Sequence, residues 1–465
     1  MSQVVFKTDW LASNPIFYNE KLGKVSLNIN DVIDFRNLEF HPEGFNNYLD
    51  FGYSILEQTP IKNVKFLRYS SKLIIEDNGK IRIEYLKDPV EKWWNYRLSE
   101  DEVIDLIRER VQEWESSVTG DIIIPTSGGY DSRLLNFLIK DKSRIRSFSY
   151  GISKNQSKSF EVVYAKKLSE ILETKWEQIQ LGEFHKYFDE WDNLFGISTH
   201  AHGMYHIEFY KKISNKVESN RNLISGIIGD AWAEYSKIKE INNIKELINL
   251  GYTHGMNADS SQSLLKSNNY LLENYFINNR EKIKDDRFRT IESMRFKIIL
   301  LSYLLKVPRY FGFNVYAPFL FEDIAMAILN LSKNRRENRK WQSDFFEKNK
   351  IDLENMNLIA DYDNNLNITG IRKVKPKPLS FNILKEVIDV NYVNWINSKI
   401  QNSKIILLSD TIMLKLMTTP KIGGLLRRIG LNFDMFHGSK DISKAYCAYL
   451  TLKPIENLII KRNKA

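Results

Sequence analysis

The sequence predicts an α/β protein in which a parallel sheet is flanked by a small β-rich N-terminal part and a helical C-terminal part. Short β-type runs separated by turn residues fill the first 90 or so positions. Apolar strand segments then alternate with helical segments, and amphipathic helical stretches dominate after about residue 235. Strand and helix alternation of this kind is typical of a parallel sheet. We therefore expect three domains, at residues 1–95, 96–380 and 381–465.

In the N-terminal part, two β-rich runs at residues 72–76 and 80–85 surround an Asn78-Gly79 turn. This arrangement predicts a β-hairpin. Apolar positions at helical spacing then predict a helix over residues 100–117, which leads into the second domain.

The second domain is expected to contain alternating strands and helices. Residues 122–124, 147–150 and 177–181 read as strands, with helices after Asp131 and over residues 160–172. His206 and Glu208 fall on a helix that leads to the segment starting at Ser225. Residues 237–350 and 380–455 are predicted to be mainly helical.

The charge and the cysteine content of the chain indicate which partners and which cellular location to expect. The 67 Lys and Arg residues against 58 Asp and Glu give a net charge of +9, a mild bias that is spread along 465 residues. Without a basic patch, nucleic acid is not favoured as a partner, and the aromatic residues Trp93, Trp94 and Trp341 are expected to serve packing. The single cysteine, Cys447, excludes an internal disulfide and favours a reducing compartment, so a cytoplasmic location is expected. The sequence shows neither a signal-peptide pattern nor a membrane-spanning run.

The loop Ser127-Gly128-Gly129-Tyr130-Asp131-Ser132 follows an apolar strand and opens a helix. Glycines allow close approach of an anion, and hydroxyls with free helix N–H groups donate to phosphate oxygens. An acidic residue there would repel phosphate unless a cation lay between them, so Asp131 is predicted to bind Mg²⁺. No Walker-type sequence occurs.

This loop resembles the PP-loop of the ATP pyrophosphatases, a HUP-like fold family, and the chain is most similar to its asparagine synthetase group. Further segments resemble that group: Gly52-Tyr53 with residues 59–67, Glu161 with Ala165 and Leu168, residues 225–230, and residues 317–320. The resemblance implies ATP and Mg²⁺ as cofactors and an N-terminal domain derived from a glutaminase.

The resemblance also implies roles for individual residues. Ser127, Gly128, Gly129, Asp131 and Ser132 would hold pyrophosphate and its Mg²⁺, with Asp230 as a second metal ligand. Tyr150 and Gly226 would lie beside the adenine. A cation beside the adenylate intermediate is expected from Arg372, Lys373 or Lys375, and we favour Lys373 as a catalytic residue.

Two positions depart from the family pattern. Ser2 follows Met1 where glutamine-using members carry a cysteine nucleophile, and Ile227 replaces an acidic residue of the second motif. The N-terminal domain is therefore expected to lack glutaminase activity, and nitrogen would come from free ammonia, a separate glutaminase or another amine.

Three histidines, His200, His202 and His206, form a local cluster. His206 is a candidate for a catalytic role, either as a substrate contact or as a general base. A packing role and a zinc site both stay open.

The predicted function is that of an ATP-dependent amide ligase, which adenylates a small-molecule carboxylate and transfers ammonia or an amine. By analogy alone, the acid is expected to be a uronic acid sugar or sugar nucleotide of surface-polysaccharide synthesis. Three alternatives remain open: an intramolecular cyclase of the lactam or lasso-peptide type, a PP-loop tRNA-modifying enzyme, and a non-enzymatic nucleotide sensor. The sequence leaves open whether the chain forms a homodimer.

Overall fold

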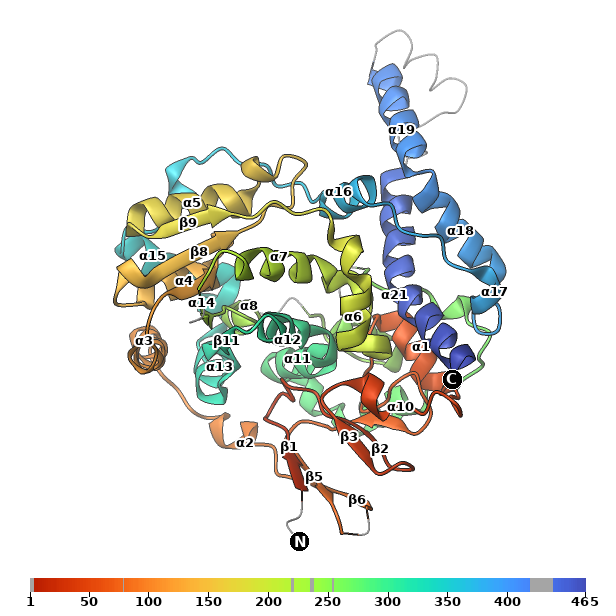
Figure 1. Cartoon of the computed structure of the whole chain (residues 1–465). Helices are drawn as coiled ribbons and strands as arrows, with labels where there is room; N and C mark the ends of the chain where they lie inside the picture. The colour runs from red at the N-terminus through yellow and green to blue at the C-terminus, as the bar shows by residue number, and fades with distance from the viewer. Residues whose placement is uncertain (1–3, 78, 219–220, 235–237, 253–254, 419–437) are drawn as a thin grey trace.

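A five-stranded parallel sheet forms the centre of the chain in the computed structural model (Figure 1). Its strands are β7 (Ile122–Pro125), β8 (Ile145–Ser149), β9 (Lys175–Gln178), β10 (Asn222–Ile224) and β11 (Asn314–Tyr316). The structure describes residues 4–77, 79–218, 221–234, 238–252, 255–418 and 438–465, without the side chains of residues 410, 414 and 417. The predicted α/β class with a parallel sheet is confirmed.

Two details of this sheet correct the sequence analysis. Strand β9 begins at Lys175 and ends at Gln178, earlier than the expected 177–181. Strand β11 lies in a region predicted to be helical. With three residues, β11 is too short to show an alternating pattern, and its pairing with β10 defines it.

The strand order is β11-β10-β7-β8-β9. Along the chain, β8 and β9 are added on one side of β7, whereas β10 and β11 are added on the other. The order therefore reverses between β7 and β10. In open parallel sheets, ligands bind outside the carboxyl ends of the strands at such a reversal, and the two loops that follow β7 and β10 lie there.

Helices cover both faces of the sheet. Parallel connections are right-handed, so α4 (Tyr130–Leu138) and α5 (Phe160–Leu172) lie on one face, while α7 (Met204–Ser214) and α12 (Tyr303–Tyr310) lie on the other. Helix α4 contacts α5, and α7 contacts α12, in agreement with this arrangement. As predicted, α7 carries His206 and Glu208 and leads to β10.

The N-terminal part contains two three-stranded sheets, ordered β1-β5-β6 and β3-β2-β4. Their elements are β1 (Val4–Lys7), β2 (Phe17–Asn19), β3 (Lys24–Ser26), β4 (Val64–Phe66), β5 (Ser71–Ile75) and β6 (Ile81–Tyr85), with helix α1 (Pro42–Phe51). The antiparallel pairing of β5 with β6 confirms the predicted hairpin. Asn78 of its turn, like Ser2, lies outside the described residues. The Trp10 indole donates to the Leu320 carbonyl at 2.8 Å, which ties this part to the turn that follows β11.

The predicted helix over residues 100–117 is confirmed as α3 (Glu100–Ser117), and Ser99 with Glu102 forms a capping box at its start. The other helices before the C-terminal region are α2 (Val90–Trp93), α6 (Phe188–Phe195), α8 (Gly229–Ala233), α9 (Ile248–Gly251), α10 (Tyr270–Asn279), α11 (Asp286–Leu301), α13 (Glu322–Leu329), α14 (Lys333–Arg336), α15 (Lys340–Lys348) and α16 (Leu366–Lys373). Trp341 on α15 is 1% exposed and its indole donates to the Ala233 carbonyl, so it serves packing.

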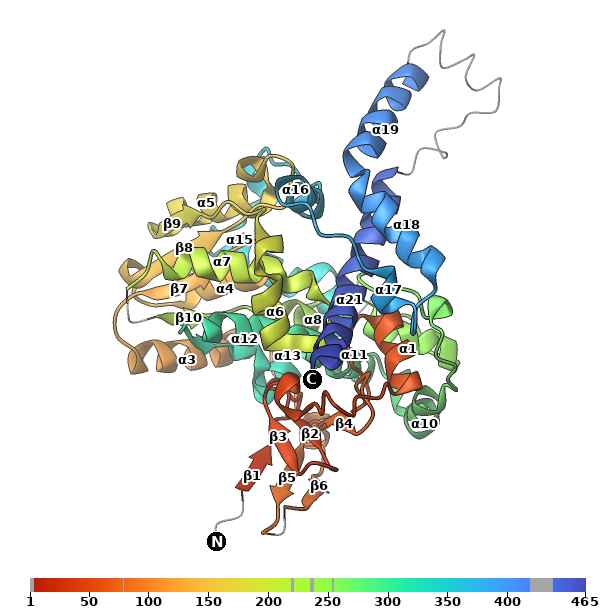
Figure 2. The same ribbon diagram turned by 45° about the vertical axis from the view of Figure 1, so that its right-hand side comes forward.

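The C-terminal region consists of α17 (Phe381–Leu384), α18 (Val390–Gln401), α19 (Ser403–Thr418) and α21 (Gly438–Lys464). Helix α21 packs along α18, and α19 projects away from the rest of the molecule (Figures 1 and 2). Over the described ranges, no helix combines the length and hydrophobicity needed to cross a bilayer.

Candidate active site

The loop over residues 127–132 connects β7 to α4 at the carboxyl edge of the sheet. Gly128 has a φ of +70°, and a Cβ at this position would lie 2.3 Å from the Tyr164 Cβ atom. Only glycine fits there without displacement of α5. The Arg133 amide donates to the Gly129 carbonyl at 3.0 Å. The N–H groups of residues 130–132 precede this first bond of the helix, and N–H groups at a helix start can bind an anion.

A buried arginine holds the shape of this loop. Arg133 is 0% exposed; its Nη2 donates to the Gly128 carbonyl at 2.8 Å. The same guanidinium makes a two-pronged contact with the Glu354 carboxylate at 2.7 and 2.8 Å. Bidentate arginine pairs fix geometry as well as charge. Sequence reasoning missed this role because an arginine in an apolar helix start gives no signal of its partner.

The second loop, residues 225–230, follows β10 and packs directly on the first. A Cβ added to Gly229 would lie 2.8 Å from the Asp131 Cγ atom, and one added to Gly226 would lie 3.0 Å from the Asp131 Cβ atom. Ile228 has a φ of +53°, which is rare for a β-branched side chain. Strain of this kind is found where surrounding structure fixes a functional loop. The structure thus brings Asp131 and the Asp230 loop together.

Asp131 is in an electrostatically unusual position. Burial raises the pKa of its carboxyl to about 7, the neighbouring Asp230 adds to the rise, and Arg339 opposes it. The Arg339 Nη1 atom lies 3.6 Å from Asp131 Oδ1. That oxygen is buried and has no hydrogen-bond partner within the described residues. A further cation at this point would stabilise the ionised carboxylate.

A second cation, Lys297 on α11, lies on the Asp230 side. Burial lowers the pKa of its ammonium, and the charge of Asp230 opposes that shift. Neither Arg339 nor Lys297 was identified from the sequence. Each lies far along the chain from both loops, and no motif links them to those loops.

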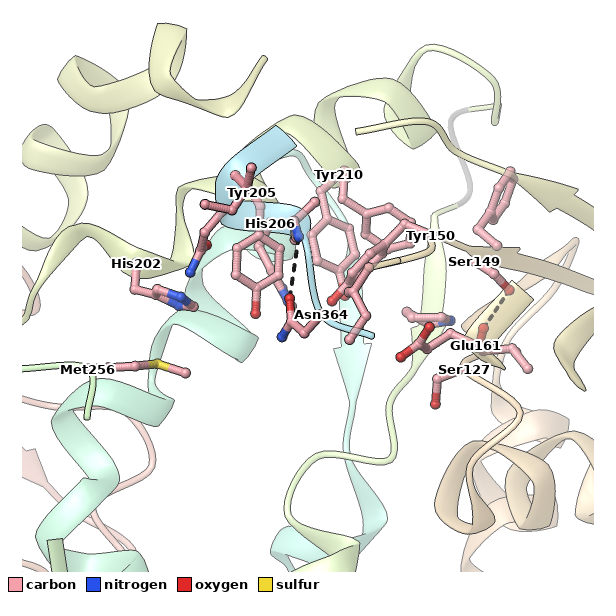
Figure 3. A pocket seen from close by; sticks show the side chains of 18 of the residues that line it. Ser127, Ser149, Tyr150, Glu161, His202, Tyr205, His206, Tyr210, Met256 and Asn364 are labelled. Atoms are coloured by element: carbon pink, nitrogen blue, oxygen red, sulfur yellow. Dashed lines mark hydrogen bonds between the residues drawn. The ribbon is translucent and has the colours of Figure 1, made fainter. Parts of the chain in front are cut away.

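A cavity of about 580 Å³ opens beside the first loop (Figure 3). Ser127 borders it, with Ser149 and Tyr150 at the end of β8 and Glu161 on α5. Helix α7 and the segment of residues 364–368 at the start of α16 each supply four lining residues, and α21 contributes Ser443 and Cys447. Of the predicted phosphate-binding residues, Ser127 is the one that borders this cavity in the described part of the chain, and the predicted adenine neighbour Tyr150 borders it as well.

The three histidines do not converge on a common point. The His200 Nδ1 atom accepts a hydrogen bond from the His202 amide at 3.1 Å, so it acts as a local cap. His202 and His206 border the cavity. Burial lowers the pKa of His202 to about 4 and that of His206 to about 3, so both rings are neutral near pH 7. Such a His206 suits neutral hydrogen bonding better than proton capture. No group of three His, Cys, Asp or Glu side chains among the described residues is arranged to hold a metal.

Lys373 lies at the end of α16, apart from the two loops. Its ammonium donates to the Leu181 carbonyl at 3.1 Å, and its side chain packs on Gly182. It borders a separate hollow with Lys154, Lys158 and Asp361. Arg339 is thus a cation beside Asp131, while the role of Lys373 beside an adenylate stays a prediction.

Ile227, the residue that replaces the family's acid, is 9% exposed and belongs to the apolar core. Glu208 on α7 is 0% exposed and accepts from the Gly182 and Glu183 amides at 3.0 and 2.9 Å. This carboxylate fixes the turn after β9. It does not take the place of the missing acid of the second loop.

Comparison with known proteins adds little to this geometry. No family model matches the chain, and no curated protein matches it. Among solved structures, the NH3-dependent NAD synthetase from Campylobacter jejuni in complex with the nitrate ion aligns at 16% sequence identity, over 53% of this chain and 96% of its own. The TM-score of 0.23 is too low to support a conclusion about fold or function.

Proposed function

We propose that the chain is an ATP-dependent ligase that activates a carboxylic acid as its adenylate and converts it to an amide. The observation that carries this proposal is the meeting of two loops at the point where the strand order reverses. There, the Asp230 loop packs on Asp131 at the start of α4, and Ser127 of the first loop borders a cavity. Polyphosphate and Mg²⁺ are the ligands that suit such a set of groups.

The residues present fit a magnesium ion. Asp131 Oδ1 is buried without a hydrogen-bond partner in the described ranges, and Asp230 raises the pKa of the same carboxyl. A protein site for Mg²⁺ commonly uses one or two carboxylates and completes its shell with phosphate oxygens and water. Asp131 and Asp230 would hold the ion, and its charge would neutralise the charge that develops on departing pyrophosphate.

In the first step, an oxygen of the acid attacks the α-phosphorus of ATP. The bond from the α-phosphorus to the bridging oxygen breaks, and pyrophosphate leaves. The N–H groups at the start of α4 and the hydroxyls of Ser127 and Ser132 would bind the pyrophosphate oxygens. Arg339 lies beside Asp131 and would add positive charge where negative charge accumulates.

In the second step, ammonia or an amine attacks the acyl carbon, AMP leaves, and one proton is released. Ile227 is apolar, so the second loop offers no carboxylate at this position to accept that proton. We propose that nitrogen arrives as ammonia or an amine and not from glutamine bound to this chain. Omission of ammonia also separates this reaction from intramolecular closure, which needs none.

The test is pyrophosphate release from ATP and Mg²⁺ with a panel of carboxylic acids, with and without ammonia. With the correct acid, oxygen-18 in its carboxylate should appear in AMP. Asp131→Asn should reduce turnover by a factor of at least about 100, in the range for loss of an electrostatic contact to the transition state.

Asp121→Asn is the matched control, because Asp121 lies at the opposite end of β7 and pairs with Arg146 at 3.4 Å. Its turnover should stay close to that of the wild type. Undiminished turnover in Asp131→Asn would disprove the role of the loop. Oxygen-18 that never reaches AMP would disprove adenylation even if ATP binds.

A further inference from the structure

The cavity beside the first loop has an aromatic wall. Tyr205, His206, Phe209 and Tyr210 on α7 line it together with Tyr150, which follows β8. Figure 3 shows the Tyr150, Tyr205, His206 and Tyr210 side chains along this side of the cavity. The Tyr150 ring centroid lies 5.8 Å from that of Tyr205 and 5.0 Å from that of Phe209, and the Tyr205 and His206 rings are 4.7 Å apart. The planes of these ring pairs meet at 60°, 69° and 71°, in tilted or edge-to-face contact, so together the rings line this side of the cavity with aromatic carbon.

The same cavity carries almost no charge. Glu161 is the one acidic side chain among the described residues that line it, and no lysine or arginine is among them. His202 and His206 stay neutral because burial disfavours their charged forms. A phosphate or second carboxylate bound here would lose its hydration without gaining a cation, which is costly.

One polar atom in the wall lacks a partner. His206 is 9% exposed, and its Nδ1 atom is buried without a hydrogen bond to any described residue. Buried polar atoms of folded proteins are nearly always paired, with protein, water or ligand. A ligand group that hydrogen bonds to the His206 ring would satisfy this position.

We propose that the acid substrate is an aromatic monocarboxylate, with its ring against Tyr150 and Tyr205 and no negative charge other than the carboxylate that is activated. That this acid is the substrate rests on the proposed function. The binding of the acid to the cavity can be measured on its own, without ATP. This assignment replaces the uronic acid expected by analogy. A sugar nucleotide would bring two phosphate charges against a lining that contains no lysine or arginine among the described residues.

The test measures binding by calorimetry in the absence of ATP and Mg²⁺. The probes are indole-3-acetate, L-tryptophan, glucuronic acid and UDP-glucuronic acid. At least one of the two aromatic acids should bind at least about tenfold more tightly than either uronic acid. Tyr205→Leu, which keeps apolar bulk but removes the ring, should weaken aromatic binding about tenfold, within the range of aromatic stacking energies. Tyr205→Phe should retain it.

Pyrophosphate release is read separately, so the two proposals can fail independently. Aromatic acids that bind but never trigger release would disprove the adenylation proposal and leave the binding assignment standing. Release triggered only by UDP-glucuronic acid would overturn the assignment and support adenylation. Competitive displacement of indole-3-acetate by ATP would show that adenine binds at the aromatic side of the cavity, and this would overturn the assignment. The failure of both aromatic acids to bind would overturn it as well.

Discussion

The Arg339 guanidinium lies 3.6 Å from the Asp131 carboxylate, although the two residues belong to distant parts of the chain. Arg339 has a φ of +55° and follows Asn338 with a φ of +51°. Two successive left-handed residues without a glycine are costly. This turn places the start of α15 and the arginine beside the first loop. The strained turn thus holds Arg339 in its position beside Asp131.

The first prediction concerns this pair. Arg339→Gln should lower turnover in pyrophosphate release about 100-fold, because a fixed charge near the departing group contributes to transition-state stabilisation. Arg335→Gln is the control, since Arg335 pairs on the surface with Glu100 at 2.6 Å and is 31% exposed. Equal effects of the two substitutions would show that Arg339 acts through stability alone.

The second prediction concerns the buried clamp. Glu354→Gln should lower the free energy of unfolding by about 3 kcal/mol, because it leaves the fully buried Arg133 guanidinium without its counter-charge. Arg133→Met should cost about 1 kcal/mol, because it removes the donor to Gly128 but leaves Glu354, which is 40% exposed, in contact with water. Denaturant titration of both variants measures this difference. The prediction fails if the two losses are equal.

The third prediction concerns pH. The folded-state pKa of Asp131 is raised to about 7, above the ordinary value of 3.8. The folded chain therefore holds a proton that the unfolded chain has released between these values. The protonated carboxyl of Asp131 therefore stabilises the folded chain at low pH. This contribution to the free energy of unfolding is lost as pH rises from about 3.8 through about 7, by at most about 4 kcal/mol at 1.36 kcal/mol per pKa unit.

Asp131→Asn should remove this contribution, so its advantage in unfolding free energy over the wild type should grow between pH 5 and pH 8 in the absence of Mg²⁺. Urea titration across that range measures it. Mg²⁺ with ATP should shrink the difference by stabilising the ionised wild-type carboxylate. A difference that does not change with pH would contradict the assigned shift.

The fourth prediction separates backbone strain from steric overlap. Gly128→Ala should abolish ATP binding and lower stability by at least about 2 kcal/mol, because the new Cβ would lie 2.3 Å from the Tyr164 side chain. Gly79 has a similar φ of +78°, but a Cβ added there would have no atom within 4 Å among the described residues. Gly79→Ala should therefore lower the free energy of unfolding by about 1 kcal/mol, which is the cost of the backbone strain at positive φ without steric overlap. ATP binding and thermal unfolding of both variants distinguish the two contributions.

The sequence by itself determined the parts of the protein that depend on local pattern. Strand β7, the helix over residues 100–117 and the hairpin of β5 and β6 follow from periodicity and turn residues that lie close together in the chain. The glycines and Asp131 of the first loop could be recognised for the same reason, since a strand, a turn and a helix start are adjacent in sequence.

Only the tertiary structure decided which distant residues meet at that loop. Arg133 pairs with Glu354, Arg339 lies beside Asp131, and α7 provides an aromatic wall for the cavity. Lys373, which the sequence led us to expect beside the adenylate, donates a hydrogen bond to the Leu181 carbonyl, and its catalytic role stays a prediction. Long-range electrostatic and packing contacts depend on how the sheet order reverses between β7 and β10, and no local pattern of residues encodes that order.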